Sequence, residues 1–136
     1  MKFKTLTGST RKIIGVQKYT IDWDGASRSK FQKSVKDFLK KYWERHVVFE
    51  EFPVAGTRMT LDLYNANKKI AIEVQGGQHT RHVPFFHGEY KNNYLMQLKR
   101  DHQKQDFCDL NDIQLVEIYE KDKLSKSFFK KLDILL

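Results

Sequence analysis

Two neighbouring segments of alternating polarity constrain the fold of this chain more than any other feature. Thr60–Tyr64 and Ile70–Gln75 each alternate between aliphatic and polar positions, which is typical of half-buried strands. The short sequence NANK at 65–68 is rich in turn-forming residues, so the two segments are expected to form a hairpin. One face of the hairpin is then aliphatic, with Leu61, Leu63, Ile70, Ile72 and Val74, and the other carries Asp62, Tyr64, Ala71, Glu73 and Gln75.

The polar face of this hairpin predicts a cation site. A two- or four-residue loop centred on 66–67 places Asp62 opposite Ala71 and diagonal to Glu73. The two carboxylates then converge with the amide of Gln75. Two such charges about 4 Å apart repel each other by roughly 4 kcal/mol at an effective dielectric constant near 20. A divalent cation removes that repulsion, so the pattern indicates a Mg²⁺ site.

Composition narrows the class of protein. The chain has 136 residues, of which 40% are hydrophobic and 13% aromatic, and this predicts one folded domain with a buried core. No apolar run has the length of a membrane span, and the first ten residues lack the apolar stretch of a signal peptide. The single cysteine, Cys108, excludes an internal disulfide framework and favours a reducing cytoplasm. The net charge of +8 favours a polyanionic partner, most simply nucleic acid.

The rest of the chain predicts three helices and two more strands around the hairpin. Residues 1–26 are expected to form a basic arm or a short strand. The other expected elements are helices over 27–46, Tyr90–Leu110 and Lys126–Leu136, and strands over Val47–Phe52 and Ile113–Tyr119. Their order predicts an α/β fold with a three-stranded antiparallel meander. The last strand is expected to pair in parallel, because a helix crosses over before it.

Helical spacing also predicts which side chains of the helices face inward. In the first helix the apolar stripe consists of Phe31, Val35, Phe38, Leu39, Tyr42 and Trp43. Its opposite face carries Lys30, Lys33, Lys36, Lys40 and Lys41, which are either solvated or in contact with phosphates. In the long second helix the expected inner residues are Tyr94, Leu95, Leu98 and Cys108.

The spacing D-(x10)-E-x-Q, formed by Asp62, Glu73 and Gln75 on adjacent strands, resembles the PD-(D/E)XK nuclease superfamily. IAIEVQGGQH, FFHG, QLKRD-x-x-K and NDIQLVEI resemble its small single-domain branch, akin to very-short-patch-repair endonucleases and phage-borne homing endonucleases. This resemblance covers most of the chain, from about Ser27 to Tyr119. It implies a restriction-endonuclease-like αβββαβ core with a central mixed sheet, in a single nuclease domain over 27–136. It also implies a setting in the cytoplasm of a bacterial or phage-infected cell.

The resemblance implies a Mg²⁺-dependent DNA endonuclease that hydrolyses phosphodiester bonds, with Mn²⁺ as a substitute metal. Asp62 and Glu73 would hold the metal, with the backbone carbonyl of Val74 as a further ligand. Related chains often place a glutamate in the first helix, where this chain has Gln32. A glutamine is a poorer ligand than a carboxylate, so a second metal is less secure.

The position of the general base is left open by the same resemblance. Most members have lysine where this chain has Gln75, and an amide can orient a water molecule but cannot accept its proton. His79 and Lys104 are the candidate bases, because a histidine titrates near neutral pH and Lys104 follows one helix later. Gln75 is otherwise an ordinary polar strand residue.

Asp101 and Lys104 lie one turn apart on the second helix, so they share a face. They form either a surface ion pair or a functional unit in which Asp101 orients Lys104 near the phosphate. The remaining candidate DNA-binding residues are Arg81, His82, His87, Lys99, Arg100, Lys33 and Lys36.

Three other interpretations remain open on the sequence. His79, His82 and His87 with Cys108 contain zinc-ligand types, but their spacing matches no common zinc motif. A second interpretation is a catalytically inactive nucleic-acid-binding module, and a third is a nuclease for branched DNA or RNA. The expected partner is double-stranded DNA and not a membrane. A homodimer is left open, because one site cuts one strand.

Overall fold

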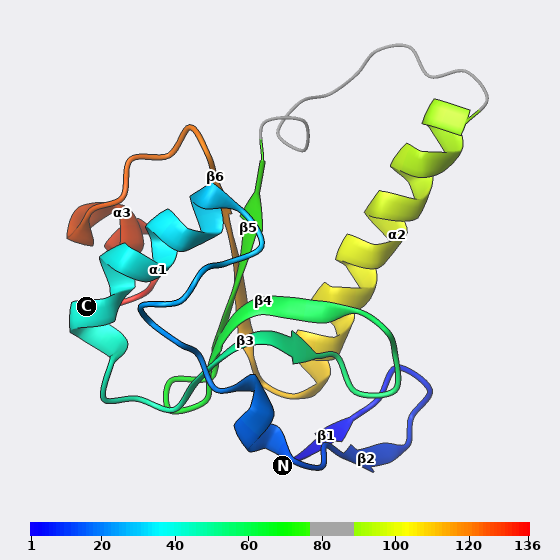
Figure 1. The fold of residues 1–136 in the computed structure, drawn as a ribbon. Helices are drawn as coiled ribbons and strands as arrows, with labels where there is room; N and C mark the ends of the chain where they lie inside the picture. Colours follow the sequence, from blue (N-terminus) through cyan, green and yellow to red (C-terminus); the bar gives the residue numbers. More distant parts are fainter. Residues whose placement is uncertain (77–88) are drawn as a thin grey trace.

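Four strands form the central sheet of this computed structural model, which describes residues 1–76 and 89–136. The strands lie in the order β3-β4-β5-β6, with the first two pairs antiparallel and the last pair parallel. Their bounds are β3 Val48–Pro53, β4 Thr60–Asn65, β5 Ile70–Gln75 and β6 Gln114–Tyr119. The predicted α/β architecture, with a meander and a parallel last strand, is confirmed (Figure 1).

Helices cover both faces of the sheet. Helix α1, Lys30–Trp43, begins at Ser29, whose side chain accepts a hydrogen bond from the backbone N–H of Gln32. It packs on one face with the short helix α3, Lys126–Lys131, through a shared apolar cluster. Helix α2, Glu89–Leu110, lies against the other face and connects β5 to β6 (Figure 1). The sheet is therefore the middle of three layers.

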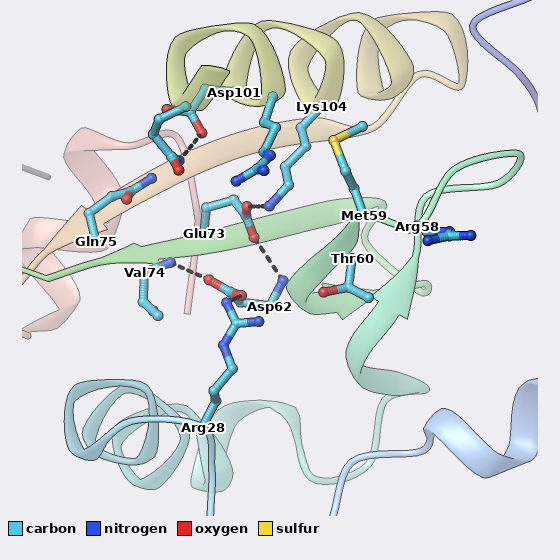
Figure 2. Close-up of a pocket in the computed structure, with 12 residues that line it drawn as sticks. Arg28, Arg58, Met59, Thr60, Asp62, Glu73, Val74, Gln75, Asp101 and Lys104 are labelled. Atoms are coloured by element: carbon cyan, nitrogen blue, oxygen red, sulfur yellow. Dashed lines mark hydrogen bonds and ion pairs between the residues drawn. The ribbon is translucent and has the colours of Figure 1, made fainter. Parts of the chain in front are cut away.

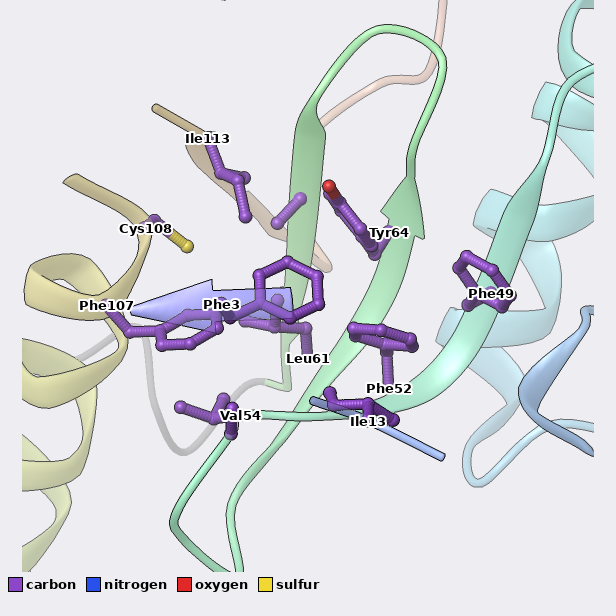
Figure 3. Close-up of a cluster of buried hydrophobic side chains, with 12 residues drawn as sticks. Phe3, Ile13, Phe49, Phe52, Val54, Leu61, Tyr64, Phe107, Cys108 and Ile113 are labelled. Atoms are coloured by element: carbon purple, nitrogen blue, oxygen red, sulfur yellow. The ribbon is translucent and has the colours of Figure 1, made fainter. Parts of the chain in front are cut away.

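The N-terminal residues belong to the layer that contains α2. They form a hairpin of β1, Lys2–Lys4, and β2, Thr10–Lys12, followed by the 3₁₀ helix η1, Val16–Tyr19. The Phe3 ring lies 5.6 Å from the rings of both Phe52 and Phe107, measured between centroids. Figure 3 shows these rings in one cluster with side chains of the sheet and α2. The burial of Phe3 thus anchors the hairpin to the core.

The β4–β5 hairpin differs in register from the sequence prediction. Leu63 pairs with Ile72 and Tyr64 with Ala71, so the loop occupies 66–69. The expected pairing of Asp62 with Ala71 is wrong by two residues. Lys69 adopts a left-handed conformation with φ +55° at the end of this four-residue loop. Continued by one residue beyond the Leu63–Ile72 pair, this register would set Asp62 opposite Glu73.

The expected common face for Leu61 and Leu63 is also wrong. Leu61 packs in the cluster under α2, whereas Leu63 packs in the cluster under α1. The physical reason is a break in strand alternation at Glu51, which has φ +52°. Its neighbour Phe52, which pairs with Leu61, lies in the same cluster as Phe49, three residues earlier. A left-handed residue within a strand rotates the backbone, so the side chains after it point to the opposite face of the sheet from the one that regular alternation predicts.

Two helices depart from the expected inward faces. Cys108 is buried, but Leu95 and Leu98 on α2 are exposed, so their predicted inner position is wrong. Figure 1 shows why: the first half of α2 extends away from the strands. Helix α3 ends at Lys131, before the predicted end at Leu136. Among the described helices, none combines the length and apolar character that crossing a membrane requires.

Candidate active site

A cavity of about 410 Å³ lies between the sheet and α2. Strands β4 and β5 and helix α2 contribute its polar lining, which includes Asp62, Glu73, Gln75, Gln97, Asp101 and Lys104. Figure 2 shows Glu73, Gln75, Asp101 and Lys104 between β5 and α2, with Asp62 next to Glu73. Three arginines, Arg28, Arg58 and Arg100, also line the cavity. The structure therefore brings the predicted acidic residues together with a concentration of positive charge.

Asp62 and Glu73 are both buried, and each carboxylate accepts a hydrogen bond from a backbone N–H of the other strand. The backbone N–H of Asp62 donates to Oε2 of Glu73 at 2.8 Å. The backbone N–H of Val74 donates to Oδ2 of Asp62 at 2.9 Å. These reciprocal bonds fix both carboxylates on adjacent strands, because a strand amide cannot move without breaking the sheet.

Burial and the neighbouring Asp62 carboxylate raise the pKa of Glu73 from 4.5 to about 7. Lys104 and the backbone N–H of Asp62 act in the opposite direction, because both stabilise the ionised form. Burial has the largest effect, so the site holds a carboxylate that titrates near neutral pH. Such a group indicates that a further positive charge in the cavity would be stabilising.

Lys104 forms an ion pair with Glu73 rather than with Asp101. Asp101 instead accepts a hydrogen bond from Nε2 of Gln97 at 3.0 Å. Residues 97, 101, 104 and 108 share one face of α2, and the buried Cys108 turns that face toward the sheet. Sequence spacing correctly placed Asp101 and Lys104 on one face, but the partner of Lys104 is decided by the packing of α2.

Gln75 directs an amide into the cavity. Gln75 is only 8% exposed, and it lines the cavity together with Glu73. Its side chain makes no hydrogen bond to any residue in the ranges 1–76 and 92–136. Figure 2 shows Gln75 and Glu73 extending from β5 toward α2. Within the cavity this amide is available to a water molecule or ligand, because it carries both hydrogen-bond donor and acceptor atoms.

Gln32 and Lys36 belong to a buried polar network beside the cavity. Nε2 of Gln32 donates to Oε2 of Glu50 at 2.9 Å and to Oε2 of Glu51 at 3.1 Å. Nζ of Lys36 lies 3.0 Å from Oε1 of Glu50, and the Lys36 side chain is 0% exposed. The left-handed backbone of Glu51 lets two consecutive carboxylates reach the same helix. The expectation that Lys36 lies on an exposed face is therefore wrong, because Glu50 draws its ammonium group inward.

Arg28 connects this network to the cavity. Its Nη1 lies 3.0 Å from Oε1 of Glu51, and its Nη2 lies 3.4 Å from Oδ1 of Asp62. Sequence reasoning missed Arg28, Glu51 and Arg58. The adjacent acids in FEEF were the available signal, because two charges in a row break the alternation of a half-buried strand.

The oxygen donors of this site fit Mg²⁺ in their chemistry. Two carboxylates, Asp62 and Glu73, lie beside the backbone of Val74, and Mg²⁺ prefers oxygen ligands. Within the part of the chain that the structure describes, no three histidine, cysteine or acidic side chains form a group able to hold a metal ion. Among the described residues, a metal bound here would have these two carboxylates as side-chain ligands, together with backbone or solvent oxygens.

Several predicted residues do not join this site. Nζ of Lys33 contacts the backbone carbonyl of Trp23 at 3.1 Å and Asp37 at 2.7 Å. Lys99 is exposed and is not part of the cavity lining. The remaining candidates lie outside the described residues: His79, Arg81, His82 and His87. The zinc hypothesis depends on three of those histidines, so it stays a prediction.

Viral proteins are among the relatives of this chain. The chain is 32% identical over 80 residues to Uncharacterized protein 094L of Frog virus 3 (isolate Goorha), a match covering 59% of this chain and 52% of that protein. It is 29% identical over 113 residues to Uncharacterized protein 307L of Invertebrate iridescent virus 6, covering 79% of this chain and 50% of that protein. The chain thus spans about half the length of these curated relatives. No protein-family model and no solved structure matches it.

Proposed function

We propose that this protein is a Mg²⁺-dependent DNA endonuclease with a PD-(D/E)XK-like site. The observation that carries the proposal is the convergence of Asp62, Glu73, Gln75 and Lys104 on one cavity. The carboxylates would supply metal ligands, and a bound cation would stabilise the ionised form of Glu73, whose pKa is raised by burial and by the Asp62 carboxylate. The three arginines at the cavity supply the positive charge that a phosphodiester backbone requires.

Each side chain has a chemical task in this proposal. Asp62 and Glu73 would hold the metal with the carbonyl of Val74. Bound Mg²⁺ would stabilise charge on a scissile phosphate and lower the pKa of an attacking water. The amide of Gln75 would orient that water through hydrogen bonds, because it has both donor and acceptor atoms. When the substrate enters, the ammonium group of Lys104 would leave Glu73 and form an ion pair with a phosphate oxygen, because an ammonium group pairs with a carboxylate or a phosphate.

The test is cleavage of supercoiled plasmid DNA with Mg²⁺, with Mn²⁺ and with EDTA. We expect nicking or linearisation that requires the metal, and its loss in Asp62→Asn. The matched control is Asp133→Asn, because Asp133 is exposed and asparagine tolerates its left-handed backbone at φ +62°. Cleavage by Asp62→Asn at the wild-type rate would show the site assignment to be wrong.

An absence of cleavage with either metal would refute the nuclease and favour a nucleic-acid-binding module. The same assay on duplex, branched and single-stranded DNA and on RNA defines the substrate. Activity confined to branched DNA or RNA would replace the duplex assignment while retaining the metal-dependent chemistry.

A further inference from the structure

The N-terminal end of this chain carries positive charge and no acidic residue. The protein has 25 lysines and arginines against 17 acidic residues, a net charge of +8. Five of those cations, and no acidic residue, fall within 1–21. The N-terminal segment therefore carries five positive charges that no acid within it balances, and its position in the fold influences where a polyanion is attracted.

The β1–β2 hairpin presents most of this charge to solvent. Its apolar side chains Phe3 and Ile13 are buried, while four cations are exposed. We refer to these cations as the basic hairpin: Lys2, Lys4, Arg11 and Lys12. None of the four forms an ion pair with a residue that the structure describes. The outward charge is therefore not neutralised within the described part of the molecule.

Specific contacts hold the hairpin in place. The backbone N–H of Lys4 donates to Oδ1 of Asn111 at 2.8 Å, and Nδ2 of Asn111 donates to the carbonyl of Lys4 at 3.0 Å. This pair joins β1 to the residue just after α2. Phe3 adds its ring contacts with the core, so the basic hairpin is a fixed surface of the domain.

The same hairpin adjoins the turn that leads into the cavity. A Cβ added at Gly56, between β3 and β4, would lie 3.3 Å from Cγ2 of Thr5 and 3.9 Å from Nη1 of Arg11. Two residues later, Arg58 lines the cavity. Figure 1 shows the hairpin beside the β3–β4 turn. Positive charge thus extends from β2 through Arg58 to the candidate active site.

We propose that the basic hairpin binds the phosphate backbone of duplex DNA and holds the duplex across the cavity. This deepens the proposed function by assigning the substrate class to a surface outside the cavity. Double-stranded substrate is favoured because the hairpin offers cations for phosphates, while its one aromatic ring, Phe3, is buried and unable to stack on a base. The basic hairpin acts through charge and position, so it contributes affinity without reading sequence.

The test is binding of a fluorescein-labelled duplex in EDTA, measured by anisotropy between about 50 and 200 mM salt. Arg11→Gln/Lys12→Gln is compared with Lys130→Gln/Lys131→Gln, whose two exposed lysines lie on α3. Both variants lose two positive charges, so general attraction changes equally. Each lost phosphate contact reduces the slope of log affinity against log salt by about 0.9. We expect a reduction near 2 in the hairpin variant and little change in the α3 variant.

Equal slopes in the two variants would overturn the proposal, as would tighter binding of a single strand than of the duplex. Binding is measured without metal, so its result is separate from cleavage. A hairpin-dependent slope without plasmid cleavage would support the basic hairpin and refute the nuclease. Plasmid cleavage with equal slopes would support the nuclease and refute the role of the hairpin.

Discussion

The carboxyl group of Glu73 should make folding stability depend on pH in a direction opposite to that of most carboxylates. Its folded-state pKa is about 7, above its usual value of 4.5. Between these pH values the folded state keeps a proton that the unfolded state has lost. The contribution of Glu73 to the free energy of unfolding is therefore highest below pH 4.5, falls as the pH rises toward 7, and is constant above that. Replacing Glu73 with glutamine removes this dependence.

The size of the effect follows from the same two values. Each pH unit over which the two states differ by one proton changes the free energy of unfolding by about 1.4 kcal/mol. Between pH 4.5 and 7 the contribution of Glu73 is then a loss of about 3 kcal/mol. The Glu73 side chain is only 6% exposed, so solvent screens this effect weakly. Other carboxylates titrate in both proteins, so the wild-type minus variant difference isolates the contribution of Glu73.

The measurement is urea unfolding of wild type and Glu73→Gln at several pH values from 4 to 8, without divalent cations. We expect the difference in stability between the two proteins to change by about 3 kcal/mol over this range. The matched control is Glu120→Gln, because Glu120 is exposed and its surroundings change little on folding. A difference that is constant with pH would show that burial does not raise the pKa of Glu73, and would remove the electrostatic argument for a cation there.

Two further substitutions test the neighbourhood of the site. Gln75→Lys should retain metal-dependent plasmid cleavage, because the resembling superfamily usually has lysine there; complete loss would instead indicate a specific requirement for the amide. Lys36→Met should reduce the free energy of unfolding by about 3 kcal/mol or more in urea, because it leaves Glu50 without its buried cation. Lys40→Met, which breaks an exposed ion pair with Asp24, should leave the free energy of unfolding almost unchanged. Equal losses in the two lysine variants would contradict the buried network.

The sequence predicted those features that depend on local pattern. Alternating polarity located β4 and β5, and helical spacing located α1 and α2, because each pattern repeats the geometry of its own element. The parallel pairing of β6 with β5 followed from the intervening helix. Asp62 and Glu73 were assigned to one site because both lie at polar positions of neighbouring strands.

Prediction from the sequence failed where a single residue departed from the local pattern. The loop lies one residue later than predicted, and the resulting shift of two residues in register kept the polar face while changing the residue opposite Asp62. The left-handed Glu51 turned a second carboxylate toward α1, and no spacing rule indicates this conformation in advance. Lys36 matched the pattern of a solvated face, but Glu50 beneath it made burial favourable.

The sequence by itself therefore determined the acidic strands, the element order and the net charge of this protein. Only the tertiary structure decided that Lys104 pairs with Glu73, that Arg28 reaches Asp62, and that the basic N-terminal hairpin adjoins the cavity through the turn containing Arg58. The physical reason is that these contacts join segments far apart along the chain. Their partners are selected by how the sheet, α2 and the hairpin pack together, and that packing is a property of the whole core.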